Sequence, residues 1–109
     1  MLESFSHARC LGPIIFLVLM ALPASAFAAD AAKGEIIAKR WCATCHQVSP
    51  DQKPVNSDVP SFVSISRQKK LTSKVLTDFL STPHPKMPDM HLSRSEIADV
   101  VAYIESLGR

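Results

Sequence analysis

Cys42-Ala43-Thr44-Cys45-His46 is the stretch on which the fold and the chemistry of this chain depend. Its five residues bring two thiols and an imidazole together, with about one helical turn between the thiols. A chain of this composition would contain the C-x-x-C-H pattern by chance only about 0.003 times. The pattern therefore indicates a functional site rather than a coincidence.

C-x-x-C-H is the attachment signature of a c-type haem, and its spacing follows from the chemistry. The thiols of Cys42 and Cys45 can add to the two vinyl groups of one haem, and His46 then lies under the iron as an axial ligand.

Other interpretations use the same residues. Trp41-Cys42-x-x-Cys45 also fits the redox motif of thioredoxin-like proteins, although that motif should follow a buried strand. A zinc site would need about four ligands, and a disulfide across so short a loop would stabilise little.

The composition of the 109 residues divides the chain into two unlike parts. Of the first 28 residues 19 are apolar, whereas residues 29–109 hold 32 apolar residues among 81, a modest share for a globular domain. The net charge of +2 argues against a nucleic-acid-binding domain, and no stretch reaches the roughly 20 apolar residues of a membrane span. About 80 residues bury only a marginal core, so we expect something besides side-chain packing to stabilise the domain.

Residues 1–28 are typical of a cleavable secretory signal peptide. A central apolar run is broken by Pro23, and Ala26-Phe27-Ala28 forms an A-x-A cleavage site. Ala24-Ser25-Ala26 is an alternative site, and a retained membrane anchor is the alternative fate of the segment. Cleavage would leave a domain of residues 29–109 whose only cysteines are those of the motif. We therefore expect export to the periplasm and no stable membrane insertion after cleavage.

Apolar periodicity predicts helices from about Asp30 to Cys42, from about Thr72 to Leu80 and from Ser93 to near the C-terminus. Ser93 and Glu96 form a capping box at the start of the last helix. A long loop from Gln47 to about Ser66 carries three prolines. No strand pattern is present, so the predicted fold class is all-α. The apolar positions of the first helix are Ile36, Ile37 and Trp41.

The chain resembles the small class I c-type cytochromes over nearly all of residues 29–109. The segments that carry the resemblance are Gly34, Cys42-x-x-Cys45-His46, Pro60-Ser61-Phe62, Met87-Pro88 and Ala102-Tyr103-Ile104. The resemblance implies that the N-terminal and C-terminal helices cross and that long loops surround one covalently attached haem. In that family a glycine eight residues before the first cysteine allows the close crossing. Gly34 stands at this spacing, with Val100 and Tyr103 as its implied contacts.

The resemblance also implies the two iron ligands. His46 would be the proximal ligand, and Met87 in its proline-bearing loop would be the sixth ligand. The flanking prolines restrict the backbone of this loop and hold the thioether in place. Met90, His84 and His91 lie within a few residues and are rivals for the sixth position.

Members of the family surround the haem with a loop carbonyl and an apolar pocket. The carbonyl of Pro60 would accept a hydrogen bond from the second ring nitrogen of His46. The residues expected to line the apolar pocket are Phe62, Ile65, Leu76, Phe79 and Leu80.

The function that the resemblance implies is single-electron transfer by a periplasmic monohaem protein that is not an enzyme. Its partners would be redox proteins that dock transiently, and we expect a monomer that binds no nucleic acid. Four lysines are expected to border the haem edge, where we interpret them as a solvated basic face, and a basic rim that steers an acidic partner is the alternative. A haem enzyme or sensor with a displaceable sixth ligand is the alternative function. The lysines expected at the haem edge are Lys69, Lys70, Lys74 and Lys86.

Overall fold

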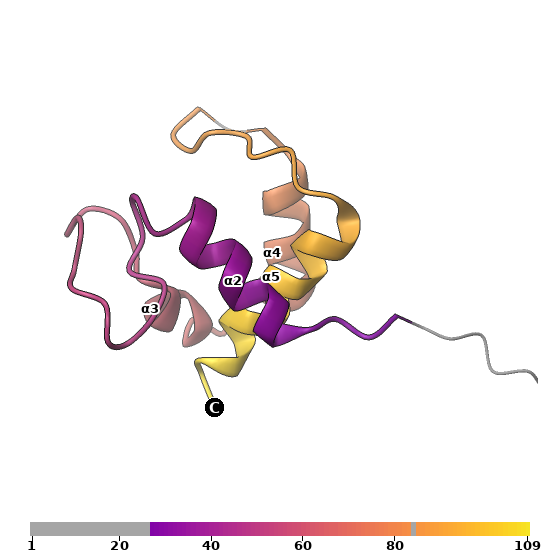
Figure 1. Cartoon of the computed structure of the whole chain (residues 1–109), viewed down its shortest axis with the longest axis horizontal. Helices are drawn as coiled ribbons and strands as arrows, with labels where there is room; N and C mark the ends of the chain where they lie inside the picture. Colours follow the sequence, from indigo (N-terminus) through magenta and orange to yellow (C-terminus); the bar gives the residue numbers. More distant parts are fainter. Residues whose placement is uncertain (1–26, 84) are drawn as a thin grey trace, which may run out of the picture.

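Figure 1 shows the computed structural model of the chain, in which residues 27–83 and 85–109 are described. These residues form four helices and no strand, so the all-α prediction is confirmed. The predicted signal peptide lies almost entirely outside the described residues. The helices are α2 (Ala31–Trp41), α3 (Phe62–Ser66), α4 (Ser73–Ser81) and α5 (Arg94–Ser106).

Every one of these helices begins at a polar side chain that caps it. The cap side chain accepts hydrogen bonds from backbone N–H groups of the first turn, which have no partner within the helix. In α5 the carboxylate of Glu96 also accepts the N–H of Ser93 at 2.8 Å, which completes the predicted capping box. The predicted helix starts are confirmed within one residue. The cap residues are Asp30, Ser61, Thr72 and Ser93.

Helix α3 corrects the sequence prediction, which placed Phe62–Ser66 in a long loop. The helix forms because Ser61 caps it, accepting the N–H of Ser64 at 3.1 Å, and because the Phe62 side chain is buried. Five residues with two serines and two β-branched side chains carry no apolar period that distinguishes a helix from a loop. Tertiary packing of Phe62 therefore decides the structure here.

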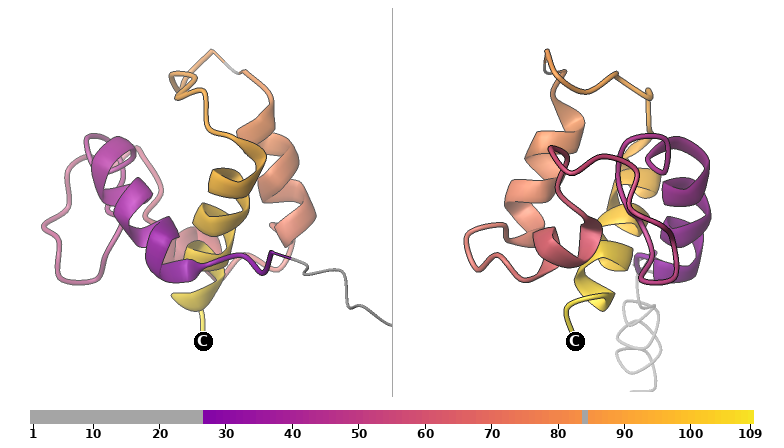
Figure 2. Two further views of the ribbon diagram at one scale, coloured as in Figure 1. Left: turned by 45° about the vertical axis from the view of Figure 1, so that its right-hand side comes forward. Right: turned by 90° about the vertical axis from the view of Figure 1, so that its left-hand side faces the viewer.

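Helices α2 and α5 make the most extensive contact between elements, and they cross as Figure 2 shows. Gly34 lies at this crossing. A Cβ atom at position 34 would collide with the backbone carbonyl of Asp99 and would lie 2.9 Å from Cβ of Tyr103. The expected contact with Tyr103 is confirmed, but the closest backbone is that of Asp99 rather than Val100. Only glycine allows the two backbones to approach this closely.

The buried face of α2 is formed by small residues, which corrects the predicted apolar positions. Gly34 and Ala38 are buried against α5, whereas Ile36 is 68% exposed and Trp41 is 49% exposed. A close helix crossing leaves no room for a large side chain, so the larger apolar residues point elsewhere. Ile37 is partly buried against the core.

The core is centred on α5, with α2 packed against it and with α3 and α4 also in contact with it. Among the described residues, no helix is both long and apolar enough to cross a membrane. The buried apolar residues are Ala38, Cys42, Val48, Phe62, Leu76, Ile97, Val100, Val101, Tyr103 and Ile104.

Candidate cofactor site

The C-x-x-C-H motif forms a tight turn directly after α2. The N–H of Cys42 donates to the carbonyl of Ala38 at 2.8 Å and continues the helix by one residue. The N–H groups of Cys45 and His46 then donate to the carbonyl of Cys42, at 3.1 and 2.9 Å. Cys42 is buried and Cys45 is exposed, and both are free thiols, so they do not form the disulfide that was one alternative.

The environment of the thiols does not match a thiol oxidoreductase. Burial raises the pKa of the Cys42 thiol to about 11, whereas the attacking cysteine of such enzymes has a lowered pKa. The motif follows a helix rather than the buried strand that the thioredoxin-like interpretation requires. Within residues 27–83 and 85–109, no three His, Cys, Asp or Glu side chains are grouped as a zinc site would need.

The His46 ring is fixed by a hydrogen bond to the loop before α3. Its Nδ1 lies 2.7 Å from the carbonyl oxygen of Pro60, which is the contact expected from the sequence. A carbonyl can only accept, so Nδ1 carries the proton and Nε2 has its lone pair for a metal. The Phe62 ring packs beside the imidazole, with 5.5 Å between the ring centroids. His46 is thus held in the tautomer and orientation of a metal ligand.

Two further hydrogen bonds attach the segment after the motif to the core. The carbonyl of Gln47 accepts the N–H of Phe62 at 2.9 Å, where α3 begins. The carbonyl of Val48 accepts the hydroxyl of the buried Tyr103 at 2.8 Å, which joins the segment to α5. The helix crossing and the motif therefore share Tyr103 as a common support.

Met87 lies in the loop between α4 and α5, and its side chain is half-buried. Met90 is half-buried too, and both side chains line one small pocket together with Leu80 and Leu92. Figures 1 and 2 place this loop at the end of the molecule where α2 ends and the motif begins. The choice of Met87 over Met90 therefore stays a prediction, supported by the prolines beside Met87.

The two histidines of this loop are placed differently. His84 lies outside the described residues. The His91 side chain is 87% exposed, and its Nδ1 lies 3.4 Å from the carboxylate of Asp89. The backbone of His91 has a φ of 52°, and its N–H donates to the same carboxylate at 2.8 Å. His91 is therefore a solvent-exposed turn residue.

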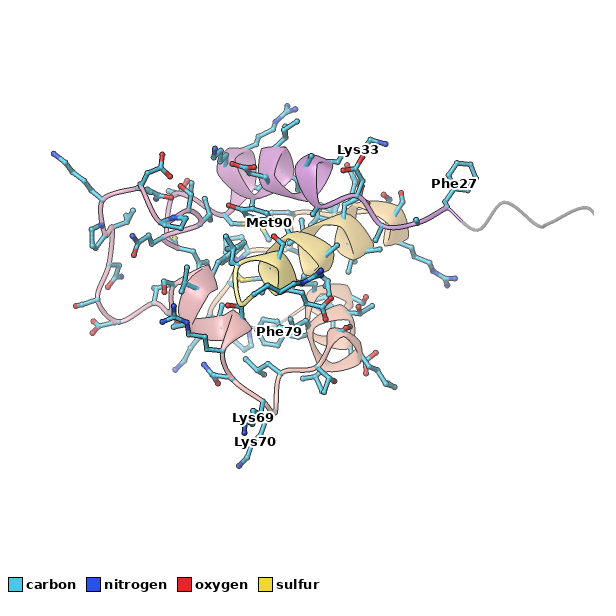
Figure 3. All side chains as sticks on the ribbon, turned by 90° about the horizontal axis from the view of Figure 1, so that it is seen from below. Phe27, Lys33, Lys69, Lys70, Phe79 and Met90 are labelled. Atoms are coloured by element: carbon cyan, nitrogen blue, oxygen red, sulfur yellow. The ribbon has the colours of Figure 1, made fainter. Side chains whose placement is uncertain are left out.

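The predicted pocket residues divide into core and half-exposed side chains. Phe62 and Leu76 are buried in the core, and Ile65 and Leu80 pack partly against it. Phe79 is 50% exposed, and Figure 3 shows it pointing from α4 toward the side on which α3 lies. Val75, four residues before Phe79 in α4, is 42% exposed and was not predicted as a pocket residue. Its i, i+4 spacing from Phe79 is the signal that identifies it.

The four lysines do not form one continuous rim. Lys69 and Lys70 project from the tip of the loop between α3 and α4, as Figure 3 shows. Lys74, in the first turn of α4, forms an ion pair with Asp78 at 2.6 Å. Lys86 lies beyond the opposite end of α4. The lysines therefore occupy separate positions before and after α4, with the charge of Lys74 partly balanced.

Comparisons with known proteins agree with this geometry. The family model described as cytochrome c oxidase, cbb3-type, subunit III matches residues 29–104. The chain belongs to this family of c-type cytochromes. Cytochrome c-552 of Bradyrhizobium diazoefficiens is 46% identical over 101 residues, which cover 93% of this chain and 97% of that protein. No solved structure matches the chain. This cytochrome c is an electron carrier with covalently bound haem c rather than an enzyme, and its partners are redox proteins.

The residues at the site fit such a haem. Two free thiols stand three residues apart, and His46 presents Nε2 while Pro60 holds Nδ1. Val75 and Phe79 leave apolar surface half-exposed on α4, where an apolar group can cover it. The thiols, the imidazole and this apolar surface are the three kinds of group that a covalent haem requires.

Proposed function

We propose that this cytochrome c is a periplasmic single-electron carrier in which Cys42 and Cys45 hold the haem and His46 and Met87 ligate the iron. The hydrogen bond between Nδ1 of His46 and the carbonyl of Pro60 carries this proposal, because it fixes the ligand tautomer before any metal is bound. The similarity to a relative named cytochrome c-552 supports it.

The bound haem supplies a one-electron couple. The chain would supply two ligands, His46 and Met87. His46 is held by Pro60, and Met87 is held by a loop whose prolines on either side restrict its backbone. Ligands held in this way would keep the reorganisation between the two oxidation states small and would leave little room for a substrate.

The apolar side chains of α4 have a part in the same function. Val75 and Phe79 would pack against the haem and exclude water from it, together with Leu80, which lines one pocket with Met87 and Met90. An apolar environment favours the iron state with the lower net charge, so these residues would raise the potential.

The same proposal includes the fate of the leader. Residues 1–28 would direct export and would be removed at Ala26-Phe27-Ala28, which leaves residues 29–109 as a monomer in the periplasm. Its redox partners would dock transiently, and no membrane insertion would follow cleavage. N-terminal sequencing of the exported protein tests this part, since a retained leader would start at Met1 and a cleaved chain at Ala29.

A redox titration with carbon monoxide as a probe tests the ligation. The wild-type spectrum should change in one reversible one-electron step, and the reduced protein should not bind carbon monoxide. His46→Ala should lose the six-coordinate spectrum, whereas the matched His91→Ala should keep it. Rapid binding of carbon monoxide to the reduced wild type would instead indicate the alternative function, an enzyme or sensor with a displaceable sixth ligand.

A further inference from the structure

Gln52 contacts the haem-attachment motif at several points, although neither the motif nor the family resemblance includes it. It lies six residues after His46 and is half-buried. Its side-chain Nε2 donates to the carbonyls of His46 at 3.2 Å and Ala43 at 3.3 Å. Its Oε1 accepts the N–H of Val48 at 2.9 Å. One side chain therefore bonds to three backbone groups within the segment 43–48.

The chemistry of this contact suits a glutamine in particular. Carbonyls at and beyond the end of a helix lack the intrahelical N–H partners that carbonyls in its interior have. A primary amide supplies two donors and an acceptor in one plane, and Gln52 uses all three functions here. A glutamate of the same shape would keep the acceptor and lose both donors at neutral pH.

The backbone of Gln52 is held as well. Its carbonyl accepts the side-chain amide of Gln47 at 2.7 Å, and its N–H donates to the carbonyl of Ser49 at 3.2 Å. The side chain thus extends from a turn that is itself fixed. Gln52 therefore connects this turn to the motif through hydrogen bonds at both its backbone and its side chain.

We infer that Gln52 is a positioning residue for His46. Gln52 holds the backbone carbonyl of His46 and Pro60 holds the ring Nδ1, so the residue is fixed at both its backbone and its side chain. The bond to Ala43 fixes the backbone between the two cysteines in the same way. This inference rests on the proposed role of His46 as the iron ligand.

The test is the proton NMR spectrum of the ferric holoprotein, where the shifted haem-methyl resonances depend on the orientation of the axial ligands. We would compare Gln52→Leu and Gln52→Glu with Gln68→Leu and Gln68→Glu, since Gln68 is exposed in the loop between α3 and α4. Both Gln52 variants should move the haem-methyl resonances in a similar pattern, because both lose the donors to Ala43 and His46. The Gln68 variants should leave the resonances unchanged.

A Gln52→Glu spectrum that coincides with that of the wild type would overturn the inference, even if the variant unfolds more easily. That result would leave Gln52 a purely structural residue and the proposed function intact. A wild-type protein without the signals of an iron-bound histidine would instead overturn the proposed ligation. If Gln52→Leu does not yield holoprotein, the haem-methyl spectrum of the isosteric Gln52→Glu variant is sufficient to test the inference.

Discussion

The Nδ1 atom of His46 lies 2.7 Å from the carbonyl oxygen of Pro60, which is 14 residues further along the chain. The contact joins the turn after α2 to the residue before the α3 cap. It links a local motif, whose spacing is fixed by covalent chemistry, to a loop whose position depends on the fold. Burial of Phe62 keeps that loop in place, because Phe62 follows Pro60 by two residues and packs against both His46 and Tyr103.

Replacing Pro60 by glycine should raise the midpoint potential. The carbonyl remains, but a freely rotating backbone holds it less well against Nδ1–H, so the histidine donates less electron density to a ferric iron. A spectroelectrochemical titration measures the change. Pro54→Gly, in the exposed part of the same loop, is the matched control and should leave the potential unchanged. Equal shifts in the two variants would show that the Pro60 contact does not tune the iron.

Replacing Met87 by alanine should remove the methionine–iron charge-transfer band of the ferric protein, while Met90→Ala should leave the band in place. Both methionines line the same pocket, and the prolines beside Met87 are the feature that favours it as the ligand. The near-infrared absorption spectrum measures the band. The opposite pattern would transfer the ligand role to Met90.

Replacing Gly34 by alanine should lower the free energy of unfolding by about 3 kcal/mol or more, because the new Cβ meets the backbone of Asp99. Helix α2 would have to move away from α5, which also loosens the Tyr103 contact. Chemical denaturation followed by circular dichroism measures the loss. At Gly108 a Cβ would lie 3.1 Å from atoms of Ser66, so Gly108→Ala should lower the free energy of unfolding by clearly less. Similar losses in the two variants would contradict the close crossing.

The capping box of α5 should make stability depend on pH. The backbone N–H and then the hydroxyl of Ser93 hold the pKa of Glu96 below its usual value. A carboxylate with a lowered pKa in the folded state stabilises fully above its unfolded pKa, about 4.3, and this contribution is lost as the pH falls through the folded pKa. The melting temperature of the wild type should therefore exceed that of Glu96→Gln at neutral pH, and the difference between the two should shrink in acid.

Thermal melts across that pH range measure the difference. Asp58→Asn, which removes a carboxylate from an exposed loop, is the control. A constant gap between wild type and Glu96→Gln at all pH values would contradict the assigned hydrogen bonds.

The sequence predicted those features that depend on local chemistry. The spacing of the motif and the caps Asp30 and Ser93 follow from a few adjacent residues, and the structure contains both caps. The Pro60 contact joins residues 14 positions apart and was expected from the family resemblance, and the structure contains it as well. The family resemblance identified Gly34 by its spacing to Cys42, but the contact that a Cβ there would make with Asp99 depends on how closely the two helices cross.

What the sequence did not predict depends on tertiary packing. Helix α3 exists because Phe62 is buried, and α2 turns Ile36 outward because small residues fill the crossing. Lys69 and Lys70 precede α4 and Lys86 follows it. Their separation depends on the length and direction of this helix, which the presence of the lysines does not predict. Gln52 resembles an ordinary polar loop residue until its three backbone partners are brought together.

The intact mass of the denatured protein, after production with a haem-maturation system, tests the central claim of one haem bound through Cys42 and Cys45 most directly. The wild-type mass should equal that of the mature chain plus one haem, and acid-acetone extraction should not change it. The Cys42→Ala/Cys45→Ala variant should show the bare chain. A wild-type protein that loses its haem on denaturation, or a double variant that keeps it, would contradict the account.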